Sequence, residues 1–438
     1  MDRRQFLCRS SMAVCGLNLR SPLFTLSGQD TPRVDGRRLS ANLDELGRYG
    51  RTATGGIDRL AFSQADLEAR KFVKDLMRFA QLDLSVDAAG NIVGRREGGD
   101  ADMPPLMLGS HIDSVPQGGN YDGPVGMLAA IEVAQTLTDR GIVLAHPLEV
   151  ILFINEEGGK TGSRAMSGEV DPKELDLPTR SGHTIREGIA IVGGDPAALQ
   201  SVLRRPGSIA AYLEMHVEQG SVLDREAVDI GVVEGIVGIK RWRVTIDGFA
   251  NHAGTTPMSD RRDALLAAAG FVEIVNRTAR DVEGEQVATV GQLEVSPGAP
   301  NVVPGRVSLS LEIRDLDMEK IDALFGAMEG DSRPLAKATR TAFAFEQYYV
   351  SRSAPTAEPI RQKIADAALD LGYSYMRMPS GAGHDAQSIA LLAPIGMIFI
   401  PSVDGISHSP QEFSRPEDIW RGANVLLNTL VELDKSAL

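Results

Sequence analysis

Continuous apolar runs alternate with amphipathic stretches along most of the chain. The runs at residues 106–109, 148–154 and 396–400 contain few polar side chains. Such runs are typical of strands buried on both faces, as in a parallel or mixed sheet covered by helices. The pattern therefore predicts an α/β fold, with a mixed sheet flanked by helices.

Helical periodicity fills the intervals between these runs. One helix is predicted to begin at Ser63, because Ser63 and Asp66 have the spacing of a capping box. A second is predicted to begin at Asp122, with Asp122 as the N-cap and Pro124 in the first turn. A last helix is expected after Arg415. These helices would cover the predicted sheet.

The pattern changes at residue 238, where apolar and polar positions alternate as in a strand with one solvated face. The next predicted elements are a helix at 263–280, strands near 287–295 and 306–314, a helix near 318–329 and a strand near 341–350. The order βαββαβ is typical of a ferredoxin-like α+β unit. We therefore predict a larger domain made of residues 39–237 and 353–438, interrupted by a smaller domain at 238–352.

The first 38 residues are predicted to be a leader followed by a linker. Arg3 and Arg4 precede a weakly apolar stretch, which resembles a twin-arginine export signal and predicts export to the periplasm. Arg20 interrupts the stretch and no A-x-A cleavage site follows, so a cytoplasmic protein with an N-terminal extension is the alternative. No later stretch reaches the roughly 18 apolar residues of a membrane-spanning helix.

The formal net charge of −14 narrows the possible partners. The chain lacks the basic surface that nucleic-acid binding needs. An acidic surface does not exclude an anionic small substrate, but locally placed Arg or Lys must then hold it. Its two cysteines, Cys8 and Cys15, both lie in the predicted leader, so any metal elsewhere must be held by histidine and carboxylate. Those donors suit zinc, manganese, cobalt or nickel.

Candidate donor residues follow directly after two predicted strands. His111 and Asp113 follow the first run, with Asp122 eleven residues beyond His111, and Glu156 and Glu157 follow the second run. Open α/β sheets bind ligands beyond the carboxyl ends of their strands. Asp113 is placed to accept a hydrogen bond from the second nitrogen of His111 and so to orient its ring. Taken singly, each pair is also compatible with an ordinary surface or core contact.

The ordered combination of motifs is more specific. The motifs are RLAFSQADLEAR (59–70), GSHIDSVPQGGNYDGPVGMLAAIE (109–132), NEEGG (155–159), GSRAMSG (162–168), EMHVEQG (214–220), NHAGTTPMSDRRDA (251–264), PNVVPG (300–305), EIRD (312–315), SGAGHDAQ (380–387) and GISHSPQEF (405–413). From about residue 40 to the end, the chain resembles the dinuclear metal amidohydrolases of the aminoacylase and carboxypeptidase-G-like superfamily. It looks most like the carbamoylase branch, which holds N-carbamoyl-L-amino-acid hydrolases, β-ureidopropionases and allantoate amidohydrolases.

The resemblance implies a centre of two divalent ions per subunit, zinc or else manganese, cobalt or nickel. The residues carried over as ligands are His111 and His216 for one ion, Glu157 and His408 for the other, and Asp122 as the bridge between them. Glu156 would be the general base that takes a proton from a water activated by the ions, and would later deliver it to the leaving nitrogen.

The same resemblance implies that the smaller domain acts as a lid and forms a homodimer. His252 would stabilise the developing oxyanion, and it would reach the partner subunit's site. Arg314 lies on the polar face of its predicted strand and would bind a substrate carboxylate, with Asn301 as its companion.

Three further residues are expected near the ureido end of the substrate, namely Gln219, Gly383 and His384. For His384 the alternative is a structural hydrogen-bonding role beside Gly381 and Gly383. One segment departs from the family pattern, because only Gly158–Thr161 separate Glu157 from Gly162. Related carbamoylases carry a longer segment there, with Arg and Phe, so this difference bears on the wall of the substrate pocket.

The expected reaction is hydrolysis of a linear carbon–nitrogen bond, with an N-carbamoyl-L-amino acid as the first choice of substrate. Allantoate and β-ureidopropionate are alternatives within the branch. An aminoacylase or a dipeptidase would use the same ligands. The alternative outside enzymes is a non-catalytic metal- or ligand-binding protein, and the presence of Glu156 with all five ligand residues argues against it.

Overall fold

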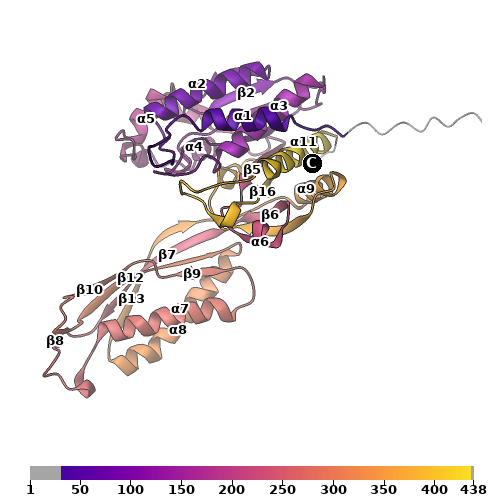
Figure 1. The fold of residues 1–438 in the computed structure, drawn as a ribbon. Helices are drawn as coiled ribbons and strands as arrows, with labels where there is room; N and C mark the ends of the chain where they lie inside the picture. Colours follow the sequence, from indigo (N-terminus) through magenta and orange to yellow (C-terminus); the bar gives the residue numbers. More distant parts are fainter. Residues whose placement is uncertain (1–30, 436–438) are drawn as a thin grey trace, which may run out of the picture. The chain divides into compact units, whose positions relative to one another are not determined.

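The computed structural model of the protein describes residues 31–435 (Figure 1). The predicted twin-arginine leader lies outside the described residues. Helix α1 (Gly36–Leu46) begins before residue 38, so the predicted end of the linker at residue 38 is wrong. Asp35 caps this helix, and Arg38 forms an ion pair with Glu132 at 2.7 Å. These polar contacts make the segment part of the larger domain.

The larger domain contains a nine-stranded mixed sheet with the order β1-β2-β4-β3-β5-β16-β6-β14, in which β15 also pairs with β6. The strands are β1 (Asp83–Val86), β2 (Ile92–Arg96), β3 (Leu106–Ser110), β4 (Leu148–Leu152), β5 (Ala211–Val217), β6 (Ile230–Ile236), β14 (Ala354–Pro355), β15 (Tyr375–Ser380) and β16 (Ile395–Ile400). The central strands β4, β3, β5 and β16 are parallel. Every residue of β3, β4 and β16 is buried, which confirms the prediction of strands buried on both faces.

Helices cover both faces of this sheet. The helices are α2 (Gln64–Phe79), α3 (Pro124–Asp139), α4 (Thr161–Ser167), α5 (Ile185–Ile191), α6 (Val222–Glu226), α9 (Glu358–Asp370), α10 (Ala386–Ile389) and α11 (Pro416–Asp434). One apolar cluster joins α1, α2, α3, α9 and α11 to the sheet, and a second joins α4 and α10 to it. Neighbouring strand residues enter opposite clusters, as Leu108 and Met107 do. The predicted fold class is thereby confirmed.

The start of α3 differs from the prediction. Gly123, not Asp122, is the N-cap, and its φ is +83°. The carboxylate of Asp122 instead faces the imidazoles of His216 and His408. A Cβ at position 123 would lie 2.4 Å from the ring of His111, so both the backbone conformation and the lack of space require glycine.

The smaller domain has the predicted βαββαβ order. Its elements are β7 (Gly238–Asp247), α7 (Ala264–Asp281), β9 (Val287–Thr289), β10 (Leu293–Ser296), β12 (Arg306–Asp315), α8 (Met318–Thr339) and β13 (Ala342–Ser351). The antiparallel sheet has the order β10-β12-β7-β13, and β9 also pairs with β12. The strand predicted near 287–295 is thus divided in two. Helix α8 continues past residue 329 because Ser332 and Leu335 extend its packed face.

The strand register separates the candidate residues of this domain. Arg314 lies opposite Ile239, close to the junction with the larger domain at Gly238. The two-stranded sheet of β8 (Asn251–His252) and β11 (Val302–Val303) lies beyond the opposite end of β7. A ten-residue strand spans about 30 Å, so His252 lies roughly that far from the junction. Among residues 31–435, none of the helices has the length and apolar character needed to span a bilayer.

Candidate metal centre

Five histidine and carboxylate side chains meet near the carboxyl ends of the central parallel strands. His111 follows β3, Glu157 follows β4 and His216 belongs to β5. Asp122 directly precedes α3, and His408 lies in the loop between β16 and α11. Because parallel strands end at the same edge of a sheet, residues far apart in the sequence become neighbours there.

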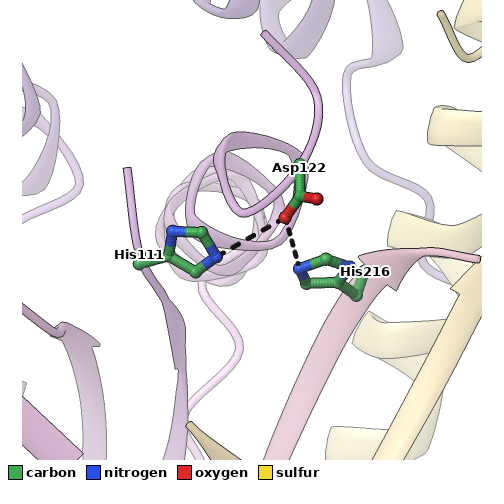
Figure 2. Close-up of side chains that lie close together, drawn as sticks. All are labelled: His111, Asp122 and His216. Carbon is green, nitrogen blue, oxygen red and sulfur yellow. Dashed lines mark ion pairs between the residues drawn. The ribbon is translucent and has the colours of Figure 1, made fainter. Parts of the chain in front are cut away.

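The first group comprises His111, Asp122 and His216 (Figure 2). The Oδ1 atom of Asp122 lies 3.7 Å from Nε2 of His111 and 3.2 Å from Nε2 of His216. All three side chains are buried, and their donor atoms lie within 4.8 Å of one another. This group presents two nitrogens and one oxygen to a common point.

The second group comprises Asp122, Glu157 and His408. Nε2 of His408 lies 3.1 Å from Oδ2 of Asp122 and 3.4 Å from Oε1 of Glu157. Asp122 therefore faces the first group with one carboxylate oxygen and the second group with the other. That is the geometry which a bridging carboxylate needs.

The hydrogen bonds of the imidazoles show whether these donors fit a cation. Nδ1 of His111 lies 3.0 Å from the carbonyl oxygen of Asp113, and Nδ1 of His216 lies 2.9 Å from that of Val217. A carbonyl only accepts, so each Nδ1 carries a proton, and Nε2 is the nitrogen directed at Asp122. Each Nε2 faces a negative oxygen of Asp122, an arrangement that needs positive charge, supplied either by a proton on that nitrogen or by a bound ion. The donor set therefore fits a divalent ion.

The pKa values show how strongly these charges interact. Burial opposes ionisation of Asp122, but His216 and His408 hold the pKa of its carboxyl well below the ordinary value. Burial raises the pKa of Glu157 to about 8, and the charge of Asp122 adds to the rise. Burial also opposes a charge on His216, yet Asp122 and Glu214 raise its pKa to about 9. The site thus concentrates negative charge that bound cations would neutralise.

Glu156 lies beside the first group. Its Oε2 atom is 3.8 Å from Nε2 of His111, and its side chain is only 10% exposed. Burial raises the pKa of Glu156 well above its ordinary value, and the nearby Asp385 and Glu157 raise it further. A carboxyl group that is easily protonated next to the ligands is suited to accept and return a proton.

The predicted hydrogen bond from His111 to the carboxylate of Asp113 is not formed. The carboxylate is 3.7 Å from Nδ1 of His111, whereas the backbone carbonyl of the same residue lies at 3.0 Å. The carboxylate accepts instead from the backbone amides of Glu156 at 3.2 Å and Glu157 at 3.1 Å. The carboxylate of Asp113 therefore fixes the loop after β4, whereas the backbone carbonyl of the same residue orients the imidazole ring of His111.

Gln219 belongs to the metal centre itself. Its Nε2 atom donates to Oδ2 of Asp122 and lies 3.5 Å from Nε2 of His408.

His384 is buried and lies 2.7 Å from the hydroxyl of Ser380. Its ring packs edge-on to that of His216, with the centroids 4.4 Å apart. This geometry favours the structural alternative for His384.

The candidate residues of the smaller domain lie at its two ends. Arg314 pairs with Glu312 at 2.7 Å, and donates at 2.7 Å to the carbonyl of Gly381, in the loop that contains Gly383. Asn301 and His252 are exposed, at the two-stranded sheet of β8 and β11.

His252 has a defined protonation pattern. Its Nδ1 atom accepts from the backbone amides of Gly254 at 3.0 Å and Thr255 at 3.2 Å. Since Nδ1 is an acceptor, the proton of a neutral ring lies on Nε2. The exposed ring therefore presents a donor, as stabilisation of an oxyanion requires.

Two cavities border the centre. One of about 980 Å³ is lined by Gln219, His408 and Arg377, among others. The other, of about 340 Å³, is lined by Glu157 and by Gly158 of the shortened segment. Both have room for a small ureido acid.

Sequence reasoning missed three polar residues around the centre. Arg59 is fully buried and donates to the carbonyl of Ile112 at 2.6 Å. The ammonium of Lys160, in the shortened segment, contacts the side chain of Gln387. Glu412 binds backbone groups beside two candidate ligands. Arg59 and Glu412 lie inside the quoted motifs, and this position is the signal that could have found them.

A histidine and carboxylate centre at the strand ends of an α/β domain is typical of metal-dependent hydrolases. The chain belongs to peptidase family M20/M25/M40, whose sequence model matches residues 107–432. Within this family it falls in the carbamoylase branch, as the following comparisons show.

Relatives match over nearly the whole chain. The N-carbamoyl-L-amino acid amidohydrolase of Geobacillus stearothermophilus is 42% identical, over 91% of this chain and 99% of that protein. The ureidoglycolate hydrolase of Arabidopsis thaliana is 35% identical, over 91% of this chain and 87% of that protein. The crystal structure of an amidase of the hydantoinase/carbamoylase family from Burkholderia multivorans has a TM-score of 0.86 and 36% identity, over 93% of this chain and 100% of that one. The protein is accordingly a hydrolase that acts on carbon–nitrogen bonds other than peptide bonds.

Proposed function

We propose that the protein hydrolyses an N-carbamoyl-L-amino acid to the amino acid, ammonia and carbon dioxide. The observation that carries this proposal is the 42% identity to an amidohydrolase of that name over almost the full length of both proteins. The two donor groups that share Asp122 support it, because they bring together the five residues that the family resemblance implies as ligands.

The chain offers places for two divalent ions. His111, His216 and Oδ1 of Asp122 would hold one ion, and Glu157, His408 and Oδ2 of Asp122 would hold the other. When bound, such ions lower the pKa of a water and polarise the carbonyl under attack. Zinc, manganese, cobalt and nickel all suit these donors.

Glu156 is proposed as the general base. Its carboxylate lies beside the first donor group, where it can take the proton of the attacking water. The carbon–nitrogen bond then breaks, and the same carboxyl delivers the proton to the leaving nitrogen. The amides of Glu156 and Glu157, bound to Asp113, keep the loop in place through both transfers.

Arg314 is proposed to bind the substrate carboxylate. Asn301, its expected companion, lies at the opposite end of the smaller domain, beside His252, and is not near Arg314 in the same subunit. Replacing Arg314 by alanine is expected to raise KM for ureido acids about 10- to 100-fold, because a charge-assisted hydrogen bond is lost. The kcat should change much less, and metal content should stay the same. Steady-state kinetics with an N-carbamoyl-L-amino acid and with its uncharged amide would measure the effect.

Arg243 provides a matched control for Arg314. It lies on the neighbouring strand, it is 58% exposed, and its closest carboxylate is Glu346 at 3.5 Å. Arg243→Ala should leave KM within about twofold, as for most exposed charges. Equal losses for the acid and its amide in Arg314→Ala would contradict the proposed carboxylate contact.

His252 is proposed to act in the active site of a partner subunit. It lies roughly 30 Å along β7 from the junction with its own larger domain. A homodimer formed through the smaller domain would bring His252 to the active site of the partner subunit. Two inactive variants, Glu156→Gln and His252→Ala, should then complement each other. Equal mixing after subunit exchange should restore about a quarter of wild-type activity, since half of the dimers are hybrids with one intact site.

The complementation experiment has a clear negative outcome. If the hybrid preparation stays as inactive as either parent while size-exclusion chromatography shows dimers, His252 does not act across the interface. A preparation that remains monomeric would contradict the dimer itself. Native mass spectrometry of differently tagged subunits would confirm that hybrids have formed.

A second candidate substrate is ureidoglycolate. The similarity to a ureidoglycolate hydrolase supports it, because this compound also joins a ureido group to a carbon that bears a carboxylate. The larger cavity at Gln219 and His408 has room for either compound.

Ammonia release by the metal-loaded protein tests these alternatives. The panel would contain N-carbamoyl-L- and D-amino acids, ureidopropionate, allantoate, ureidoglycolate, an N-acetyl amino acid and a dipeptide. Preference for an N-carbamoyl-L-amino acid would support the first proposal, and preference for ureidoglycolate the second. Activity confined to the acetyl compound or the dipeptide, detected as free amine, would overturn both.

A further inference from the structure

Glu412 joins the two parts of the chain that form the larger domain. It is 5% exposed and lies in the loop between β16 and α11. Its Oε1 atom accepts from the backbone amides of Tyr121 at 2.9 Å and Asp122 at 3.0 Å, across 290 residues in the latter case. Its Oε2 atom accepts from the backbone amide of His408 at 3.2 Å and from the hydroxyl of Ser407 at 2.8 Å. One carboxylate therefore binds the backbone of two candidate ligands.

Ser407 adds a second connection between the same residues. Its hydroxyl lies 3.0 Å from Oδ2 of Asp122 as well as close to Glu412. Oδ2 is the oxygen that Asp122 directs to His408. Glu412 and Ser407 thus both contact the second donor group, in which Asp122 comes from the first part of the larger domain and His408 from the second.

Gly119 shows how closely this carboxylate is packed. A Cβ at position 119 would lie 2.2 Å from Oε1 of Glu412 and 2.4 Å from its Cβ. Gly119 is not among the glycines with positive φ, so its backbone conformation permits alanine. The side chain of Glu412 leaves no room for the added methyl group. Alanine at this position would displace Glu412 without removing any hydrogen-bonding group.

Asp113 performs a comparable role on the other side of the centre. Its carboxylate accepts from two successive amides, those of Glu156 and Glu157, just as Glu412 accepts from those of Tyr121 and Asp122. Two ligand-bearing loops are thus each fixed by a buried carboxylate that is not among the ligands.

We infer that Glu412 is a positioning residue that fixes Asp122 relative to His408 and so sets the affinity of the centre for the ion between them. The inference rests on the proposed function in one respect, namely that the centre binds divalent ions. Outer partners of metal ligands typically change metal affinity by about 10- to 100-fold. Glu412 has the contacts for such an effect, although it is not itself one of the candidate ligands.

The test is a titration of the metal-free, full-length protein with Co²⁺, followed by the visible absorption of the bound ion and by chelator competition. Glu412→Gln should raise the Kd for the ion held by Asp122, Glu157 and His408 about 10- to 100-fold and change the Co²⁺ spectrum. Glutamine has an NH₂ group in place of one carboxylate oxygen, so the hydrogen bonds which that oxygen accepts are lost. Gly119→Ala should shift affinity and spectrum in the same direction, and it decides the question if Glu412→Gln fails to fold.

Asp434 offers a matched control. Its carboxylate also accepts from two successive backbone amides, those of Ala145 and His146, each at 2.8 Å. Asp434→Asn should lower the melting temperature but leave Co²⁺ affinity and spectrum unchanged. Wild-type affinity and spectrum in both Glu412→Gln and Gly119→Ala would overturn the inference, as would an equal loss in Asp434→Asn. A wild-type protein that binds no Co²⁺ would instead overturn the proposed metal centre, and this inference with it.

Discussion

Replacing Glu156 by glutamine is expected to lower kcat by about two to four orders of magnitude and to leave the bound metal in place. Glutamine has nearly the same shape but cannot take a proton from water. The contact that holds this residue, from its backbone amide to Asp113 at 3.2 Å, does not involve the side chain and remains. Ammonia release and metal analysis of the same preparation would measure both parts of the prediction.

Glu149 is the control for this substitution. It is a buried glutamate on β4, seven residues before Glu156, and it pairs with Arg95 and Arg204 at 3.0 Å each. Glu149→Gln should lower the melting temperature and leave kcat within a few-fold. If Glu156→Gln kept kcat within tenfold of wild type, the general base would have to be another group.

The second large effect is expected for Asp122→Asn. Asp122 is shared by the two donor groups, with Oδ1 directed to His216 and Oδ2 to His408. Asparagine offers an oxygen on one side and an NH₂ group on the other, so at most one ion should remain. Turnover should fall by about 10²- to 10³-fold, which is the usual loss when one contact that stabilises the developing charge is removed, because the ion that would make this contact is no longer held. Elemental analysis after desalting gives the number of ions per chain.

His408→Ala is the comparison for Asp122→Asn. His408 belongs to the second donor group alone, so its loss should remove one ion and spare the site at His111 and His216. The Asp122→Asn protein would contradict the bridging role if it retained two ions with wild-type affinity. One ion per chain in both variants is the expected result, and a lower turnover in Asp122→Asn than in His408→Ala would show that Asp122 also supports the site at His111 and His216.

Much of the architecture could be predicted because the burial of a strand or helix is visible in the local pattern of apolar and polar residues. The continuous apolar runs indicated β3, β4 and β16, and the alternation after residue 238 indicated the first strand of the smaller domain. The meeting of His111 and Glu157 was open to prediction for a related reason, since each follows a parallel strand. His408 and His216 required the family resemblance, because neither follows a run that sequence pattern alone connects to the other ligands.

Hydrogen-bond partners were harder to predict. Asp113 was expected to bind the imidazole of His111, but the loop after β4 directs two amides at its carboxylate. Asp122 had the sequence position of a helix cap, yet its carboxylate faces imidazoles instead. Glu412 lies in a polar loop that would usually be solvated, and its burial depends on chain 290 residues away. Such choices depend on the three-dimensional course of loops, which local sequence does not specify.

The position of β16 also determines when the protein can finish folding during synthesis. β16 enters the sheet between β5 and β6, with Phe399 beside His216, although both of its neighbours are made more than 150 residues earlier. Until the last part of the chain leaves the ribosome, β5 therefore has an open edge, and His408 is absent from the centre. The nascent chain therefore lacks one of the five candidate ligands for most of its synthesis, and the complete set exists only once the last part of the chain has been made.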